Sequence, residues 1–96
     1  MNYFDNVKIF YTCAVVEKST DDNKFRQEVE KCVRRFNAGD WGEVSEFDGE
    51  QNDETVKEGG MVLGAYDTSQ GRVWIIAESS NAYEYDKITV LFPNEY

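Results

Sequence analysis

Carboxylate side chains form the densest group of chemically active residues in this sequence. Between positions 40 and 58 the chain has eight acidic residues and a single base, Lys57. The acids of this stretch, called the acidic segment below, are Asp40, Glu43, Glu46, Asp48, Glu50, Asp53, Glu54 and Glu58. Closely spaced carboxylates can bind a metal ion, transfer protons, or take the place of nucleic-acid phosphates in a basic groove.

The spacing within the acidic segment does not fit a calcium loop. Asp48, Glu50 and Asn52 match the first ligand positions of such a loop. The sixth position, where the loop requires glycine for its sharp turn, is Asp53, and the twelfth, which should be a bidentate glutamate, is Gly59. We therefore expect no calcium site here.

Cysteine and histidine usage argues against zinc and against nucleophilic catalysis. The chain has no histidine and only two cysteines, Cys13 and Cys32, too few ligands for a closed zinc site. Without histidine, a serine or cysteine nucleophile also lacks its usual base. Tyr83 and Lys87 have the spacing of the dehydrogenase Tyr-Lys pair, but no glycine-rich βαβ unit accompanies them. We expect a non-enzymatic protein with no metal and no cofactor, and two reduced thiols.

Composition is typical of one small domain with its own core. Hydrophobic residues make up 41% of the 96 residues and aromatic residues 15%. No apolar run approaches the roughly 18 residues of a membrane span, and the first residues lack a secretory signal. We expect a cytoplasmic protein that does not bind membranes. Its net charge of −9 disfavours direct nucleic-acid binding and favours basic partners.

A β-hairpin is expected at the centre of the fold. Two β-prone runs, within 61–66 and 72–78, flank Asp67-Thr68-Ser69-Gln70-Gly71, which has turn chemistry. Val73–Ala77 lacks polar alternation and predicts a central strand buried on both faces. A further strand is predicted over Ile88–Phe92, ended by Pro93, with a loop at Ser79–Ala82.

The strongest helix signal covers Asp22 to Asn37. Its apolar residues fall at helical spacing and form one stripe: Phe25, Val29, Cys32, Val33 and Phe36. The cluster Ser19–Asp22 predicts the helix start, and Gly39 the stop. A short polar helix is expected over Asp48–Lys57, with its apolar anchors at Val44, Phe47 and Val56.

The N-terminal run Val7–Val16 predicts a strand over at least its first half, and Ala14–Lys18 fits either more strand or a short helix. The expected order is strand, helix, short helix and three strands. We predict an α+β domain over residues 1–96. It should have a small, mostly antiparallel sheet of three or four strands, covered on one face by one amphipathic helix and one short helix.

Several motifs resemble a family of short proteins carried by phages, plasmids and conjugative elements, mostly of Gram-positive bacteria. The matching residues are Gly39-Asp40-Trp41-Gly42, Asn52, Gly60, Ala65-Tyr66, Trp74-Ile75-Ile76, Glu78, Thr89–Pro93 and Glu95-Tyr96. The family often has a basic residue and a histidine before the Gly-Asp-Trp-Gly turn, and an Asp-Arg pair after the Trp-Ile-Ile strand. This chain has neither feature. The resemblance implies a mobile-element origin and a compact fold, with no assigned activity.

Two interpretations remain open for each candidate surface. Trp41 is either an exposed recognition residue or a plug in the core. The acidic segment either binds a basic groove of a host defence nuclease, of CRISPR or restriction type, or is a solvated surface. A generic protein-interaction module is the alternative function. Nucleic-acid binding through the basic residues of the main helix is a weaker one: Lys24, Arg26, Lys31, Arg34 and Arg35. The oligomeric state is left open.

Overall fold

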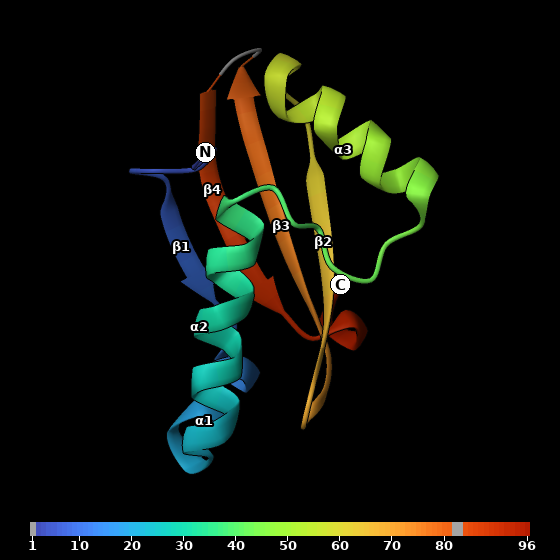
Figure 1. The fold of residues 1–96 in the computed structure, drawn as a ribbon. Coiled ribbons are helices and arrows are strands. Elements are labelled where there is room, and N and C mark those ends of the chain that lie inside the picture. The colour runs from blue at the N-terminus through green and yellow to red at the C-terminus, as the bar shows by residue number, and fades with distance from the viewer. Residues whose placement is uncertain (1, 82–83) are drawn as a thin grey trace.

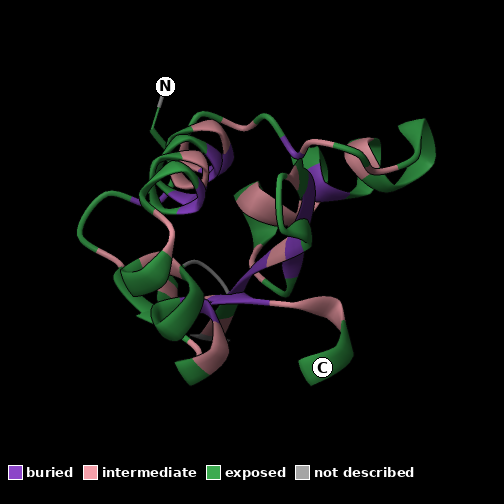
Figure 2. Cartoon of the chain, turned by 90° about the horizontal axis from the view of Figure 1, so that it is seen from below, coloured by how far each residue is buried: buried purple, intermediate pink, exposed green. Residues whose placement is uncertain are grey.

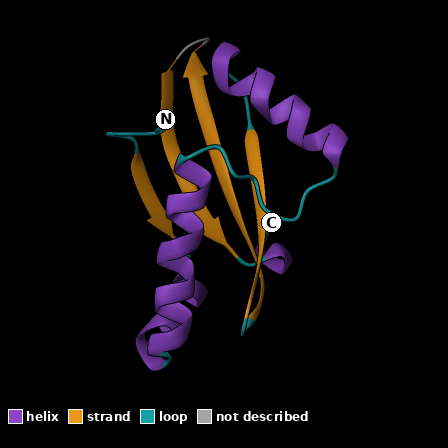
Figure 3. Ribbon diagram, viewed as in Figure 1, coloured by secondary structure: helices purple, strands orange, loops and turns teal. Residues whose placement is uncertain are grey.

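The fold is a two-layer α+β domain, seen in a computed structural model that describes residues 2–81 and 84–96 (Figures 1 and 3). The elements, in chain order, are β1 (Lys8–Tyr11), α1 (Cys13–Asp21), α2 (Asn23–Asn37), α3 (Glu46–Glu58), β2 (Val62–Thr68), β3 (Gly71–Asn81), β4 (Glu84–Leu91) and the 3-10 turn η1 (Pro93–Glu95). This confirms the predicted fold class. It adds one helix, α1, to the predicted order.

The four strands form one mixed sheet in the order β1-β4-β3-β2. β2, β3 and β4 are antiparallel neighbours, whereas β1 runs parallel to β4. The predicted hairpin is confirmed, but its loop contains only Ser69 and Gln70, because Thr68 pairs with Gly71. The Thr68 hydroxyl accepts from the Gln70 N–H and donates to the Gly71 carbonyl, and Gly71 has φ +100°.

The predicted loop at Ser79–Ala82 is wrong for the residues described. β3 continues to Asn81, with irregular register between Glu78 and Asn81, and Ala82 lies outside the described residues. β4 likewise begins at Glu84, before the predicted Ile88. The strands extend because tertiary contacts hold them there: the half-buried Tyr85 donates its hydroxyl hydrogen to the Thr55 carbonyl of α3, 2.9 Å away.

At the N-terminus the short-helix alternative is correct. α1 starts after Thr12, whose side chain accepts from the Val15 N–H, and Val15 is fully buried. Of the predicted cap cluster, only Asp22 caps α2, accepting from the Phe25 N–H at 3.1 Å. Ser19–Asp21 instead form the last turn of α1, because the apolar contact of Val15 stabilises a helix there.

The core lies between α2 and one face of the sheet (Figure 2). Phe25, Val29, Cys32 and Phe36 of the predicted stripe are buried, while Val33 is half-buried. They pack against alternate residues of the central strand β3, namely Val73, Ile75 and Ala77, all fully buried. On the opposite face Ile76 is also buried and Trp74 contacts the ring of Tyr96, so β3 is central and largely covered on both faces, as predicted.

Candidate functional site

Helix α3 presents the acidic segment. Its N-cap, Ser45, accepts a hydrogen bond from the Asp48 N–H at 3.0 Å. Glu46 and Asp48 lie in the first turn and Lys57 in the last, where these charges suit the helix dipole. The predicted helix is confirmed and extends to Glu46–Glu58, because the serine cap starts it two residues earlier.

Asn52 attaches α3 to the edge strand β2. Its side-chain amide donates to the Leu63 carbonyl at 2.9 Å, and its amide oxygen accepts from the Leu63 N–H at 3.5 Å. Asn52 is the one polar residue buried among those described, with 8% of its surface exposed. The sequence pattern does not predict this structural role for Asn52. Its spacing of four residues from the half-buried Val56 is the signal that places both on the inward side of α3.

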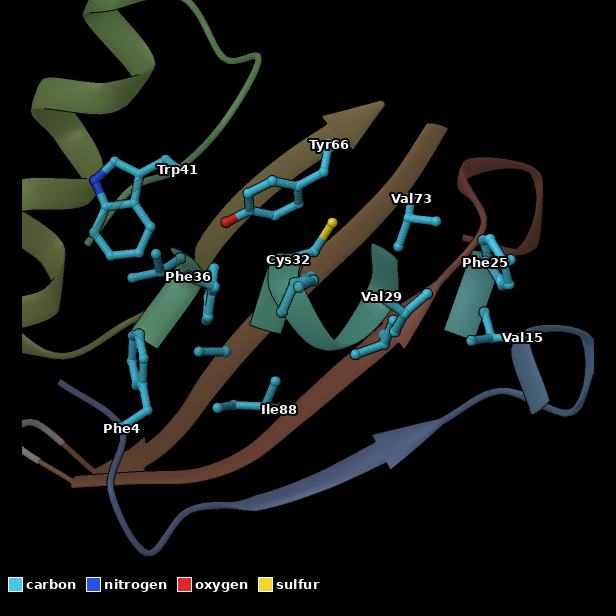
Figure 4. Packing of buried hydrophobic residues seen from close by; sticks show 14 residues of the cluster. Phe4, Val15, Phe25, Val29, Cys32, Phe36, Trp41, Tyr66, Val73 and Ile88 are labelled. Atoms are coloured by element: carbon cyan, nitrogen blue, oxygen red, sulfur yellow. The ribbon is translucent and has the colours of Figure 1, made fainter. Parts of the chain in front are cut away.

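Trp41 is a core residue, so its interpretation as an exposed recognition residue is wrong. Only 6% of its surface is exposed, and its ring packs edge-on against Phe36 at a centroid distance of 5.3 Å (Figure 4). The indole N–H donates to Asp53 Oδ1 on α3 at 2.9 Å. Asp53 is therefore a second attachment of the helix to the domain.

Asp40 stabilises the turn that leads to α3. Its carboxylate pairs with the Arg35 guanidinium at 2.7 Å and accepts from the Gly42 N–H at 3.1 Å. The Arg35 hydrogen bond holds the pKa of Asp40 below its usual value. The Arg35 guanidinium also lies 5.0 Å from the centre of the Tyr66 ring, and the Tyr66 hydroxyl donates to the Asp40 carbonyl.

Gly42 lets the backbone after Trp41 run along the outer edge of β2. The Ala65 N–H donates to the Trp41 carbonyl at 3.0 Å, and the Glu43 N–H donates to the Ala65 carbonyl at 2.6 Å. Gly42 has φ +76°, and a Cβ atom there would collide with the Ala65 carbonyl oxygen. This short parallel bridge, together with Asn52, covers the edge of β2.

All eight acids of the acidic segment are exposed, as a binding surface requires. Asp40 and Asp53 have the structural roles just described. Among residues 2–81 and 84–96, the remaining six side chains make no hydrogen bond or ion pair: Glu43, Glu46, Asp48, Glu50, Glu54 and Glu58. The structure therefore brings together, on or beside one helix, six carboxylates that make no ion pair within the described residues, although Glu43 lies close enough to Arg72 to help raise the pKa of that guanidinium.

Phe47 does not anchor α3, contrary to the prediction. Its side chain is 68% exposed, whereas Val44 and Val56 are half-buried against the core as expected. Phe47 lies on the outward side of the helix because it is five positions before the inward-facing Asn52, a rotation of about 140°. An exposed aromatic ring thus sits within the acidic surface.

The described residues contain no group of three or more histidine, cysteine, aspartate or glutamate side chains that could hold a metal ion. Both cysteines are free thiols, with Cys13 exposed and Cys32 buried on α2. The arrangement around α3 can present negative charge and one aromatic ring to a partner.

In the part of the chain that the structure describes, no helix is long and apolar enough to cross a membrane. No protein-family model, curated protein or solved structure matches this chain.

Proposed function

We propose that this chain is a non-enzymatic binding protein of a phage or plasmid that acts in the cytoplasm of its bacterial host. Its partner is a host defence nuclease of the CRISPR or restriction type, which it inhibits by occupying the basic groove that normally holds nucleic acid. The observation that carries the proposal is the set of six exposed carboxylates on or next to α3 that make no ion pair within the described residues.

The attachment of α3 makes this surface suitable for binding. Asn52 holds the helix to Leu63, Asp53 to Trp41, and the Thr55 carbonyl to the Tyr85 hydroxyl. A helix fixed in this way loses little conformational entropy when a partner binds. The acids are therefore preorganised, unlike those of a disordered acidic tail.

The spacing of the outward acids favours recognition by lysine and arginine side chains. Glu46, Glu50 and Glu54 recur every four residues, a rise of about 6 Å along one side of the helix. Phosphates of one DNA strand recur about every 3.4 Å of the helix axis. The row of carboxylates therefore has roughly half the linear charge density of one DNA strand. It suits a basic groove that contacts only some of the phosphates along the strand.

Phe47 adds an apolar contact that a nucleic-acid phosphate cannot make. It precedes Glu50 by three residues and lies on the same outward side, with 68% of its side chain exposed. Aromatic residues, phenylalanine among them, are enriched in protein–protein interfaces, where the core is apolar and the rim is polar. A partner that combines basic residues with an apolar pocket fits this surface best, which also supports the alternative of a more general protein-interaction module.

Direct nucleic-acid binding through α2 is less well supported. Of its basic residues, Arg26 pairs with Glu30 at 3.0 Å and Arg35 pairs with Asp40. The rest of the chain contributes a strongly negative field, since the net charge is −9.

The test is affinity capture from a bacterial host lysate with three baits: the parent, Glu50→Lys/Glu54→Lys, and Glu17→Lys/Asp21→Lys. Both double variants reverse two exposed acids that lie four residues apart on a helix, so they are matched in charge. We expect mass spectrometry to identify a nuclease that is retained by the parent and by Glu17→Lys/Asp21→Lys, but not by Glu50→Lys/Glu54→Lys. Added duplex DNA should displace this nuclease from both baits that retain it. Equal retention on all three baits would contradict the proposal.

A further inference from the structure

An open hollow of about 230 Å³ lies between α3 and the edge strand β2, two elements that are side by side in Figure 1. Its lining combines polar side chains of the helix with apolar side chains from the strand and from the segment before the helix. The lining residues are Asp48, Gln51, Asn52, Val44, Met61 and Leu63. Asp48, Gln51 and Asn52 share one side of α3 because three and four residues separate them.

The apolar part of the hollow is held in place. Leu63 and Val44 are half-buried, whereas Met61 is 51% exposed and its sulfur accepts from the Tyr96 hydroxyl at 3.9 Å. Asn52 joins the two walls through its hydrogen bonds to both backbone groups of Leu63. Because the walls are fixed, a ligand can bury apolar surface here without first ordering the hollow.

Asp48 gives the hollow a negative charge. It is the one charged residue among the described residues of the lining. Its carboxylate is exposed and makes no hydrogen bond or ion pair within residues 2–81 and 84–96. Together with Glu46 in the same first turn, it outweighs the partial charge of about +0.5 at the helix N-terminus. The hollow therefore attracts a cation and repels an anion.

The combination of charge and apolar surface narrows the class of ligand. A wholly apolar ligand would remove water from the Asp48 carboxylate without replacing its hydrogen bonds, which is unfavourable. A calcium ion would find a single carboxylate, whereas it prefers about six to eight oxygen ligands. An anionic lipid or nucleic-acid phosphate is repelled by Asp48. The ligand that satisfies the whole lining is a cation on an aliphatic stem.

We propose that this hollow receives an arginine side chain of the protein partner. The aliphatic carbons of the arginine contact Met61 and Leu63, and its guanidinium pairs with Asp48. The amide oxygen of Gln51 is a second acceptor, which suits the five N–H donors of a guanidinium. The ammonium group of lysine is more strongly hydrated and lacks this planar geometry. The inference rests on the proposed function, since it assigns one contact between α3 and the basic groove.

A small arginine analogue tests the hollow without the partner. The probe is N-acetyl-arginine methylamide, added to the isotope-labelled full chain and followed by two-dimensional amide NMR. The amide signals of Asp48, Gln51 and Leu63 should shift to saturation, with a dissociation constant of the order of 1 mM for so small a ligand. The matched control ligand is N-acetyl-citrulline methylamide, which has an uncharged group of the same shape. Equal shifts with the citrulline and arginine analogues would overturn the proposal, and so would equally tight binding of N-acetyl-lysine methylamide.

Two variants matched in charge separate local pairing from the general field of the protein. Asp48→Asn and Glu50→Gln each change the formal net charge from −9 to −8, but Glu50 does not line the hollow. Asp48→Asn should weaken binding of the arginine probe by about fivefold or more, since hydrogen bonds to a charged group are the stronger ones. Glu50→Gln should bind the probe like the parent. Equal weakening in two variants with native amide spectra would overturn the proposal, because the field alone would then explain binding.

These measurements are independent of nuclease capture. Binding of the arginine probe in the hollow, without capture of a nuclease from the lysate, would support the arginine subsite and contradict the proposed function. Capture of a nuclease that depends on Glu50 and Glu54, with no binding of the probe in the hollow, would overturn the arginine subsite and leave the proposed function standing.

Discussion

The Asn52 side chain is hydrogen-bonded to both backbone groups of Leu63, through its NH₂ group to the carbonyl at 2.9 Å and through its oxygen to the N–H at 3.5 Å. One amide thus takes the place of a neighbouring strand at the edge of β2. The same contact helps to hold the acidic helix in place, so one residue contributes both to protection of the sheet edge and to presentation of the acidic segment.

Replacing Asn52 by leucine should destabilise the domain because it leaves the Leu63 groups without their partners. The expected loss is about 1–3 kcal/mol in the free energy of unfolding, measured by urea denaturation. Amide hydrogen exchange at Leu63 should also become faster. Gln51→Leu, at the exposed neighbouring position, is the control and should change little. Equal stability of the two variants would show that the Asn52 contact is dispensable.

Trp41 and Phe47 should differ sharply in their contribution to stability. Trp41→Ala removes a buried ring and its hydrogen bond to Asp53, at a cost of about 3–5 kcal/mol. Phe47→Ala removes an exposed ring and should change stability by less than about 0.5 kcal/mol. Thermal and urea unfolding measure both effects. A stable Trp41→Ala variant would return Trp41 to the candidate contact residues.

Acid should weaken the turn at Asp40. The Arg35 hydrogen bond lowers the pKa of Asp40 in the folded state, so the native protein binds this proton less readily than the unfolded chain. Its stabilisation is complete above the unfolded pKa of about 3.9 and is lost as pH falls through the lower folded value. Asp40→Asn keeps the acceptor for the Gly42 N–H but cannot titrate. Its urea midpoint should therefore fall less steeply than that of the parent below about pH 4. If the urea midpoints of the two proteins fell equally steeply below about pH 4, this role of Asp40 would be contradicted.

The two thiols should react at very different rates. Cys13 is exposed, whereas Cys32 is 4% exposed and burial raises the pKa of its thiol. A chromogenic disulfide reagent should modify one thiol quickly in native protein and the second only after denaturation. Cys13→Ser identifies the fast site. Rapid native modification of that variant would mean that α2 opens readily from the sheet.

Sequence patterns predicted the elements whose signals are local. The stripe from Phe25 to Phe36 and the turn before Gly71 each specify their structure through neighbouring residues. The helix and the hairpin both form where predicted, although the hairpin loop is shorter than the five-residue turn. The sequence of α1 is ambiguous because its apolar run is too short to show a period. The extension of β3 to Asn81 and of β4 to Glu84 depends on cross-strand pairing, which no short window contains.

The candidate site was predicted only in outline. The acidic segment and its helix follow from composition, but the structural use of Asp40 and Asp53 depends on Arg35 and Trp41, five and twelve residues away. A charge-reversal set that includes Asp53 would damage the fold as well as the surface. Glu50 and Glu54 avoid this problem, because their side chains make no hydrogen bond or ion pair within the described residues.

The most direct measurement of the proposed function is the affinity of the captured nuclease for the parent and the two double variants, at low and at physiological salt. Each variant replaces two negative charges by two positive ones, so the formal net charge rises by four from −9 in both. Glu17→Lys/Asp21→Lys should bind like the parent. Glu50→Lys/Glu54→Lys should bind at least about tenfold more weakly, and the parent's affinity should fall as salt rises. Equal binding of all three proteins, or binding indifferent to salt, would show that the acidic segment is only a solvated surface.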